Sequence, residues 1–244
     1  MARTKSWPLV ASLALMAAVS AKTADANTLA LSTFDTDEDM WVGLACPNPG
    51  LCVGPEVLLP NPGKFRHVAT GGPGGVGDGF IQGEDPDSGN VAQLKAPPKF
   101  ITALPNADTL SFDVLVEDPD GTGAFENDPT PAIAITGGGS TIVYGAQNPA
   151  IGVWTHFDVA LAPGPGWVVV TSGGFAPADA SDFATVMGAV SQLTFIGEWL
   201  NDDADIDTGG LDNVRLSAVP VPAALPLLLS AFGLLAIVRR RRAA

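Results

Sequence analysis

The chain reads LSFDVLV at residues 110–116, where apolar side chains alternate with polar ones. The even-numbered positions carry Leu, Phe and Val, while Ser111 and Asp113 point the other way. A period of two is typical of a β-strand with one buried face, because successive side chains of a strand lie on opposite sides. We therefore predict a strand here, in a sheet that packs on a hydrophobic core.

The same alternation returns at residues 153–161, which read VWTHFDVAL. It predicts a second strand whose inward face includes Val153 and Phe157. Trp154 and His156 then point outward. An outward His156 is expected to be an ordinary surface residue.

Further apolar runs of strand length are separated by Gly, Pro, Asn and Asp at intervals typical of β-sandwiches. They predict strands at 29–34, 80–83, 91–94, 132–136, 141–145, 167–171, 193–199 and 211–217. One helix is expected at 178–190, because Pro177 and Asp179 are start signals and Phe183 and Val186 belong to a helical apolar stripe. No repeat or linker divides the chain. The expected fold class is all-β, a single antiparallel sandwich with one short helix.

The composition supports this class and limits the partners. Of the 244 residues, 28 are Gly and 21 are Pro, which argues against a helical bundle. Residues 27–218 hold 5 basic and 25 acidic side chains, a formal charge of −20. A surface this acidic repels phosphate backbones and anionic lipid headgroups, so we expect no nucleic-acid partner.

The N-terminus has the layout of a secretory signal peptide. Arg3 and Lys5 precede an apolar run at 8–21, and small residues follow it. The run is shorter than the about 18 apolar residues that a membrane helix needs. We expect a signal peptide at 1–26 that is cleaved after Ala26, and cleavage after Ala21 is the alternative.

The C-terminus reads VPVPAALPLLL at 219–229, within a longer apolar run that four arginines follow at 239–242. This arrangement resembles the bacterial PEP-CTERM sorting signal in its VPxPA variant. The resemblance implies a sorting tail at 219–244, with a transmembrane helix at 223–238 that stays in the inner membrane until processing. It also implies an exosortase-type sorting protease as partner, and export to the cell surface or an extracellular matrix. An ordinary C-terminal anchor is the alternative.

Short motifs in the middle of the chain resemble the laminin B (domain IV) family. They are GFI at 79–81, LKAP at 94–97, LSFDV at 110–114 and the closing GLDNVRL at 210–216. The resemblance spans nearly all of residues 30–217. It implies a jelly-roll sandwich at 27–218, related to carbohydrate-binding modules and without enzymatic chemistry. Extracellular polysaccharide or surface proteins are the partners that it implies.

Cys46 and Cys52 are the two cysteines, and the residues between them are mostly turn formers. Because export places them in an oxidising compartment, we expect a disulfide that pins a surface turn. The spacing differs from that of a Cys-x-x-Cys redox motif. No further Cys or His lies nearby in the sequence to complete a zinc site.

The sequence holds no distinctive catalytic motif. His67, His156 and Tyr144 are the available proton shuttles near neutral pH, and neither Gly-x-Ser-x-Gly nor His-Glu-x-x-His occurs. Two carboxylates can carry out glycoside hydrolysis, but 25 acidic residues form pairs by chance. We expect no enzyme but an exported surface or matrix module that binds carbohydrate or has a structural role. A carbohydrate-active hydrolase that uses acidic residues is the alternative.

Acidic loops are the candidate metal ligands, because calcium takes six to eight oxygens from flexible loops. None of these loops fits an EF-hand. In jelly rolls that this chain resembles, the first and last strands run side by side, and calcium is often held between an acid just after the first strand and an Asp near the last. Asp35 and Asp212 occupy those places. The resemblance thus implies a calcium site at these two residues, and solvated acidic loops are the alternative.

Aromatic faces bind sugar rings in related modules, which draws attention to the tryptophans. Trp199 shares a face with Leu193 and Phe195 and is expected in the core. Trp154 has an outward phase, so it is the candidate for a sugar contact. The alternative is that Trp154 is an edge or packing residue.

Overall fold

The structure, a computed structural model, describes residues 27–47, 57–58, 64–84, 90–119, 121, 123–125, 130–197, 199–200 and 208–219. The signal peptide and, apart from Val219, the sorting tail with its transmembrane helix lie outside these residues and stay predictions. Within the described ranges, no helix is both long enough and apolar enough to cross a membrane.

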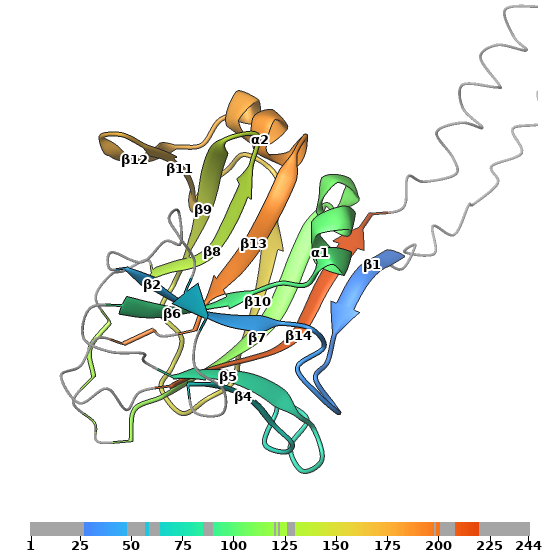
Figure 1. Cartoon of the computed structure of the whole chain (residues 1–244), viewed down its shortest axis with the longest axis vertical. Coiled ribbons are helices and arrows are strands. Elements are labelled where there is room, and N and C mark those ends of the chain that lie inside the picture. Colours follow the sequence, from blue (N-terminus) through green and yellow to red (C-terminus); the bar gives the residue numbers. More distant parts are fainter. Residues whose placement is uncertain are drawn as a thin grey trace, which may run out of the picture. The chain divides into compact units, whose positions relative to one another are not determined.

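The first of two antiparallel sheets has the strand order β10-β7-β14-β5-β4, and β1 also pairs with β14 (Figure 1). Its strands are β1 (Asn27–Ser32), β4 (Phe65–Val68), β5 (Phe80–Glu84), β7 (Thr109–Glu117), β10 (Thr155–Ala160) and β14 (Thr208–Ala218). The first and last strands are neighbours, because β1 runs antiparallel to the second half of β14.

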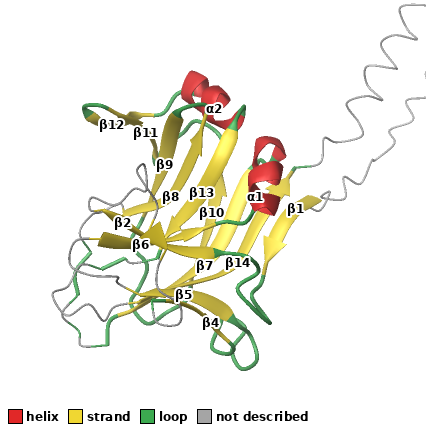
Figure 2. Cartoon of the chain, viewed as in Figure 1, coloured by secondary structure: helices red, strands yellow, loops and turns green. Residues whose placement is uncertain are grey.

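The second sheet has the order β12-β11-β9-β8-β13-β6-β2-β3 (Figure 2). Its strands are β2 (Val42–Pro47), β3 (Val57–Leu58), β6 (Asn90–Lys95), β8 (Thr130–Gly137), β9 (Ser140–Ala146), β11 (Trp167–Thr171), β12 (Gly174–Pro177) and β13 (Val190–Ile196). Two sheets of antiparallel strands confirm the predicted all-β sandwich.

The core is built from the inward faces of both sheets. Phe112 of the first sheet contacts Phe195 of the second with ring centroids 5.0 Å apart. Trp41 lies 5.4 Å from Phe195 and 5.5 Å from Phe100. All four side chains are buried. Trp199 is buried in the same cluster, which confirms its predicted core position.

Within the described residues, two α-helices lie against the sheets, where the sequence predicted one in this domain. The predicted helix is α2 (Ala180–Met187), which contacts β8 and β9. Asp179 caps it, accepting hydrogen bonds from the backbone N–H groups of Ser181 and Asp182, as its start signal indicated. The expectation of a single helix was wrong, because α1 (Pro98–Ala103) contacts β1 and β13 and continues into the 3₁₀ turn η1 (Leu104–Asn106).

One predicted strand begins later than its sequence pattern indicated. The pattern starts at Val153, but β10 starts at Thr155. Gly152, with φ of 74°, makes a turn just before, so Val153 is 56% exposed instead of facing inward. His156 is exposed at the surface, as predicted.

Two glycines allow the sheets to touch backbone to backbone. A Cβ on Gly209 of β14 would lie 2.2 Å from the carbonyl oxygen of Gly197, which follows β13. No side chain fits this crossing, because contacts this short require one backbone to move.

We therefore expect Gly209→Ala to destabilise the domain by about 3 kcal/mol, the upper range for overpacked interiors. The matched control is Gly173→Ala, because a Cβ there meets nothing closer than 3.9 Å. Urea unfolding of both variants measures the difference. Equal midpoints for the two variants would contradict the crossing.

Candidate functional site

The last strand carries an irregularity at Asp212 and Asn213. Before it, Thr208–Leu211 of β14 pairs with β5, and after it Val214–Ala218 pairs with β1. The pairing with β7 also shifts register here. Asn213 has a positive φ of 49°, a conformation that Asn tolerates better than most residues. The irregularity leaves Asp212 opposite Asp113 of β7, and both side chains lie on the face away from the core.

Asp212 is a fully buried carboxylate with few hydrogen bonds. Its Oδ1 accepts from the backbone N–H of Asn213 at 2.6 Å. Its Oδ2 has only a 3.4 Å contact with Nδ2 of Asn213. Burial raises the pKa of Asp212 to about 8, and the negative charges of Asp78, Asp113 and Asp35 add to the increase against the hydrogen bond from Asn213. Three other carboxylates therefore act on this position.

Asp78 lies next to Asp212, a neighbour that sequence reasoning missed. A Cβ on Gly72 would lie 2.7 Å from Oδ2 of Asp78 and 3.1 Å from Oδ2 of Asp212, so the two carboxylates converge at Gly72. The backbone N–H of Gly74 donates to Oδ2 of Asp78 at 2.5 Å. Asp78 is a single acid in a glycine-rich loop, and only that isolation within GGPGGVGDG could have marked it.

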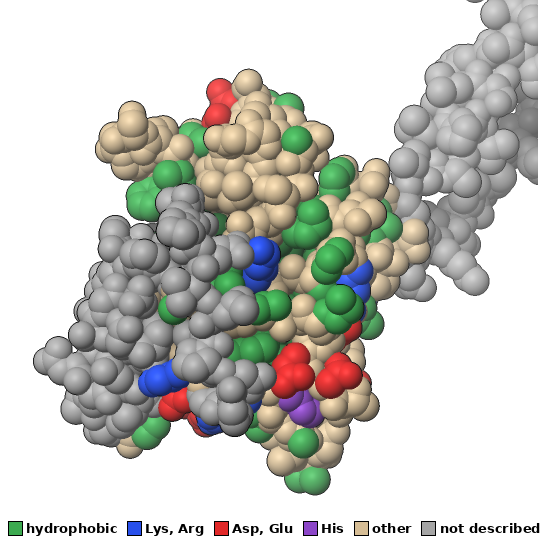
Figure 3. Space-filling view, viewed as in Figure 1, with side chains coloured by type: hydrophobic (Ala, Val, Ile, Leu, Met, Phe, Trp, Pro, Cys, Tyr) green, Lys and Arg blue, Asp and Glu red, His purple; other side chains and the backbone are tan. Residues whose placement is uncertain are grey.

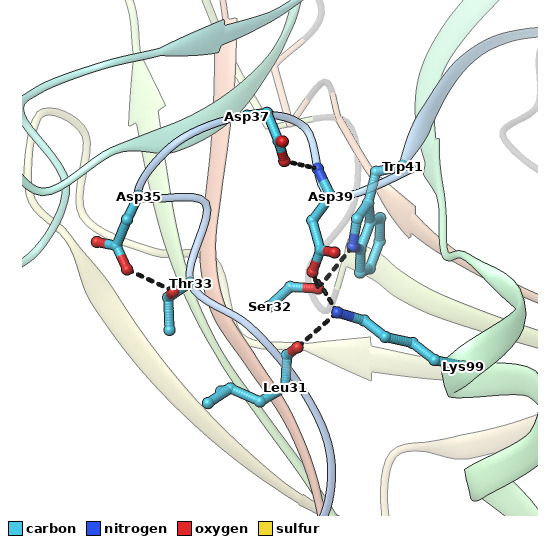
Figure 4. Close-up of polar contacts among 8 residues, drawn as sticks. All are labelled: Leu31, Ser32, Thr33, Asp35, Asp37, Asp39, Trp41 and Lys99. Atoms are coloured by element: carbon cyan, nitrogen blue, oxygen red, sulfur yellow. Dashed lines mark hydrogen bonds and ion pairs between the residues drawn. The ribbon is translucent and has the colours of Figure 1, made fainter.

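Asp35 lies in the loop after β1, with its carboxylate at the surface. Its Oδ2 accepts from the hydroxyl of Thr33 at 2.6 Å. Figure 4 shows Asp35 and Thr33 on the opposite side of the loop from Asp39 and Lys99. Acidic side chains gather beside a histidine near this loop (Figure 3). Asp35 is thus close enough to raise the pKa of Asp212, but its side chain is held by Thr33.

The rest of this loop is held by hydrogen bonds to Ser32 of β1 and to Lys99 of α1 (Figure 4). Ser32 donates to Asp39 at 2.6 Å and accepts from Nε1 of Trp41 at 3.0 Å. Lys99 of α1 pairs with Asp39 and donates to the carbonyl of Leu31 at 2.7 Å. These contacts fix the loop between β1 and β2, and with it the backbone that carries Asp35.

A polar row continues from Asp212 to the edge of the sheet. Nδ2 of Asn213 donates to Asp113 at 2.8 Å, and Nδ1 of His156 lies 2.6 Å from the other oxygen of Asp113. Asp158 lies 3.5 Å from Nε2 of His156. Partial burial lowers the pKa of His156, but contact with Asp113 and the charge of Asp158 outweigh it, so the pKa lies above 6.5.

Trp154 stands beside this row, half-buried and fixed in place. Its Nε1–H donates to the carbonyl of Gly71 at 2.8 Å. Its ring meets Phe80 edge to face, with centroids 5.2 Å apart. Gly210 lies under the ring, since a Cβ there would be 3.1 Å from Cη2 of Trp154. The neighbouring side chain of Val153 is exposed.

The other sequence-based expectations have these outcomes. In the described part of the chain, no three His, Cys, Asp or Glu side chains are arranged to hold a metal ion, so the convergence at Gly72 comprises two carboxylates. Calcium at Asp35 and Asp212 stays a prediction. Cys52 lies outside the described residues, so the bond to Cys46 also stays a prediction.

No protein-family model matches the chain, and no curated protein is similar to it in sequence. The solved structures that resemble it include the L4b domain of human laminin alpha-2, with 14% identity, a TM-score of 0.45, and coverage of 57% of this chain and 79% of that chain. The CBM22-1 xylan-binding domain of Paenibacillus barcinonensis Xyn10C has 12% identity and a TM-score of 0.41, over 80% and 97% of the two chains. The mannan-recognising carbohydrate-binding module TmCBM27 has 14% identity and a TM-score of 0.39, over 80% and 99%. At TM-scores below 0.5, the fold assignment depends on the strand pairing of this chain itself.

Proposed function

We propose that the domain is a non-catalytic binding module of the cell surface or extracellular matrix, and that it holds polysaccharide on the outer face of the first sheet. The observation that carries this proposal is the fixed, half-buried indole of Trp154, which Gly71, Phe80 and Gly210 position. An aromatic ring that is already ordered loses little conformational entropy when a ligand stacks on it.

The polar row next to Trp154 supplies hydrogen-bonding groups for sugar hydroxyls. Asp113 and Asp158 are acceptors, and His156 between them has a donor or acceptor nitrogen on each side. The domain's charge of −20 repels uronate and sulfate groups. The ligand class that fits this face is therefore a neutral polysaccharide.

A calcium ion is the second part of the proposal. Asp78 and Asp212 would hold it, with Asp35 nearby, and oxygen donors of this kind suit calcium. The buried carboxylate of Asp212, with its raised pKa, supports this assignment, because a cation would offset the repulsion between Asp212 and the neighbouring Asp78 and Asp35. The ion would supply a structural link between the β4–β5 loop and the last strand, and no chemistry.

The module would reach the surface by export. The termini support this part through the signal-like residues 1–26 and the PEP-CTERM-like tail, which would be the substrate of an exosortase-type protease. We expect mass spectrometry of the native protein to show a first residue near Asn27. A native protein that begins at Met1 would contradict export.

We expect Trp154→Ala to weaken binding of a neutral polysaccharide about thirtyfold, because truncating a central aromatic contact typically costs about 2 kcal/mol. A glycan array with the wild-type chain first identifies the neutral polysaccharide, and calorimetry then compares the variants. Phe175→Ala is the matched control, since Phe175 is an exposed aromatic of β12 in the other sheet.

Three outcomes would contradict the proposal. The wild-type chain could bind no glycan on the array. Trp154→Ala could bind as tightly as Phe175→Ala, which would place the ligand elsewhere. Release of reducing ends in a parallel turnover assay would favour the hydrolase alternative, with Asp113 and Asp158 as the carboxylates to replace first.

A further inference from the structure

The Trp154 indole and the carboxylates of Asp78 and Asp212 contact two consecutive residues, Gly71 and Gly72. The carbonyl of Gly71 accepts the indole N–H at 2.8 Å. The next residue, Gly72, is the point where Asp78 and Asp212 converge. One peptide unit therefore separates the proposed sugar contact from the proposed cation site.

The loop around these two glycines is tied to Asp78 in two ways. The backbone N–H of Gly72 donates to the carbonyl of Asp78 at 2.9 Å, and the N–H of Gly74 donates to its side chain. The N–H of Gly71 donates to the carbonyl of Gly75 at 3.1 Å. These bonds link the backbone of Asp78 to Gly72, and through the Gly71–Gly72 peptide to the carbonyl that accepts the Trp154 N–H.

Both positions require glycine. Gly71 has φ of 100°, a region that L side chains rarely adopt. Gly72 is buried, and a Cβ on it would push against both carboxylates. The two carboxylates thus exclude a side chain at residue 72, and the positive φ disfavours one at residue 71.

We propose that Gly71 and Gly72 are positioning residues that couple cation binding at Asp78 and Asp212 to the position of the Trp154 indole. Without a cation, no ionic link joins Asp78 and its loop to Asp212 of β14. A bound cation bridges the two carboxylates and so fixes the Gly71 carbonyl that accepts the indole N–H. Because such coupling is reciprocal, anchoring Trp154 also strengthens cation binding. This inference rests on the cation site of the proposed function.

The first experiment observes Trp154 directly, by fluorine NMR of the full chain labelled with fluorotryptophan. The Trp154 signal is assigned by its loss in Trp154→Phe. We expect calcium to shift this signal, while the signal of Trp167, whose Nε1–H donates to the carbonyl of Ala160, stays in place. If calcium raises the melting temperature and leaves the Trp154 signal unmoved, the coupling is wrong. If calcium changes neither, the cation site itself does not exist and the coupling falls with it.

The second experiment measures the reciprocal effect, because a nearby ion could shift the Trp154 signal through space. Trp154→Phe removes the bond to Gly71 and should weaken calcium binding about threefold to fivefold, the equivalent of one ordinary hydrogen bond. Trp167→Phe removes the same kind of bond elsewhere and should leave calcium affinity unchanged. Equal affinities for wild type and Trp154→Phe would overturn the coupling.

A glycine pair tests the link itself. Gly72→Ala should abolish the calcium response of the melting temperature and also shift the Trp154 signal, because its Cβ displaces the carboxylates. Gly173→Ala, in the open turn between β11 and β12, should change neither. If Gly72→Ala loses the calcium response but keeps the wild-type Trp154 signal, the two sites are independent and the inference fails.

Discussion

With calcium removed by a chelator, the free energy of unfolding should fall as the pH rises from about 4 to about 8. The cause is Asp212, whose pKa is about 8 in the folded protein against an ordinary value of 3.8. Below pH about 4 both states keep the proton, so Asp212 contributes nothing. Above pH about 4, Asp212 ionises in the unfolded chain but keeps its proton in the folded protein. This difference favours unfolding until the pH reaches about 8, where Asp212 ionises in the folded protein as well. The full loss is on the order of 5 kcal/mol.

Calcium should remove about half of this loss, because the ion stabilises the ionised carboxylate. At a hundredfold excess over its Kd, an ion that binds only the folded state adds about 2.7 kcal/mol. Asp212→Asn should abolish the calcium response and flatten the pH dependence in chelator. Urea unfolding at several pH values, with calcium or with chelator at equal ionic strength, measures both effects.

Asp158→Asn is the matched control, since Asp158 lies on the same face of the sheet but is exposed. It should keep the calcium response and most of the pH slope, because Asp158 acts on the pKa of His156 and is not among the charges that raise the pKa of Asp212. Wild-type protein that melts identically with millimolar calcium and with chelator has no cation site. Equal pH slopes for wild type and Asp212→Asn in chelator would show that Asp212 ionises normally.

Phe195→Ala should cost about 3 to 5 kcal/mol of stability, the range for truncating a buried Phe. Phe195 is 1% exposed and contacts both Phe112 of the other sheet and Trp41 after the first loop. Its removal leaves a cavity where the two sheets meet, which the surrounding strands cannot close without losing their register.

Phe175→Ala controls for the chemistry of the change, because Phe175 of β12 is 58% exposed. Its substitution should stay within about 0.5 kcal/mol of wild type. Denaturant unfolding of the full chain compares the two. A loss below about 1 kcal/mol for Phe195→Ala would mean that the inner faces of the sheets are not packed as described.

The sequence predicted strands both from polar–apolar alternation and from short apolar runs. The pattern at 110–116 lies within β7, and the run at 167–171 matches β11. It missed β2, because Gly43 and Pro47 leave only three residues between them, too few for an alternation or an apolar run of strand length. It missed α1 because six residues are too few to show a helical period.

The candidate site was predicted only where a local motif marked it. Asp212 stands in the closing motif of the chain, and Asp35 follows the first predicted strand. Asp78 reaches Asp212 only because β5 pairs with β14, a contact between distant parts of the sequence. The anchoring of Trp154 by Gly71 depends on the same long-range pairing, which periodicity cannot reveal.

The pairing of β1 with β14 also determines when the domain can finish folding. It joins Asn27 to Ala218, the two ends of the described domain, so the first strand waits for the last before its ladder forms. Contacts of such high sequence separation form slowly, because a long loop must close before they stabilise the chain. The proposed cation site, which includes Asp212 of β14, would be completed equally late. The proposed export would make use of this order, because a chain that stays open until its final strand arrives can pass through a translocation channel unfolded.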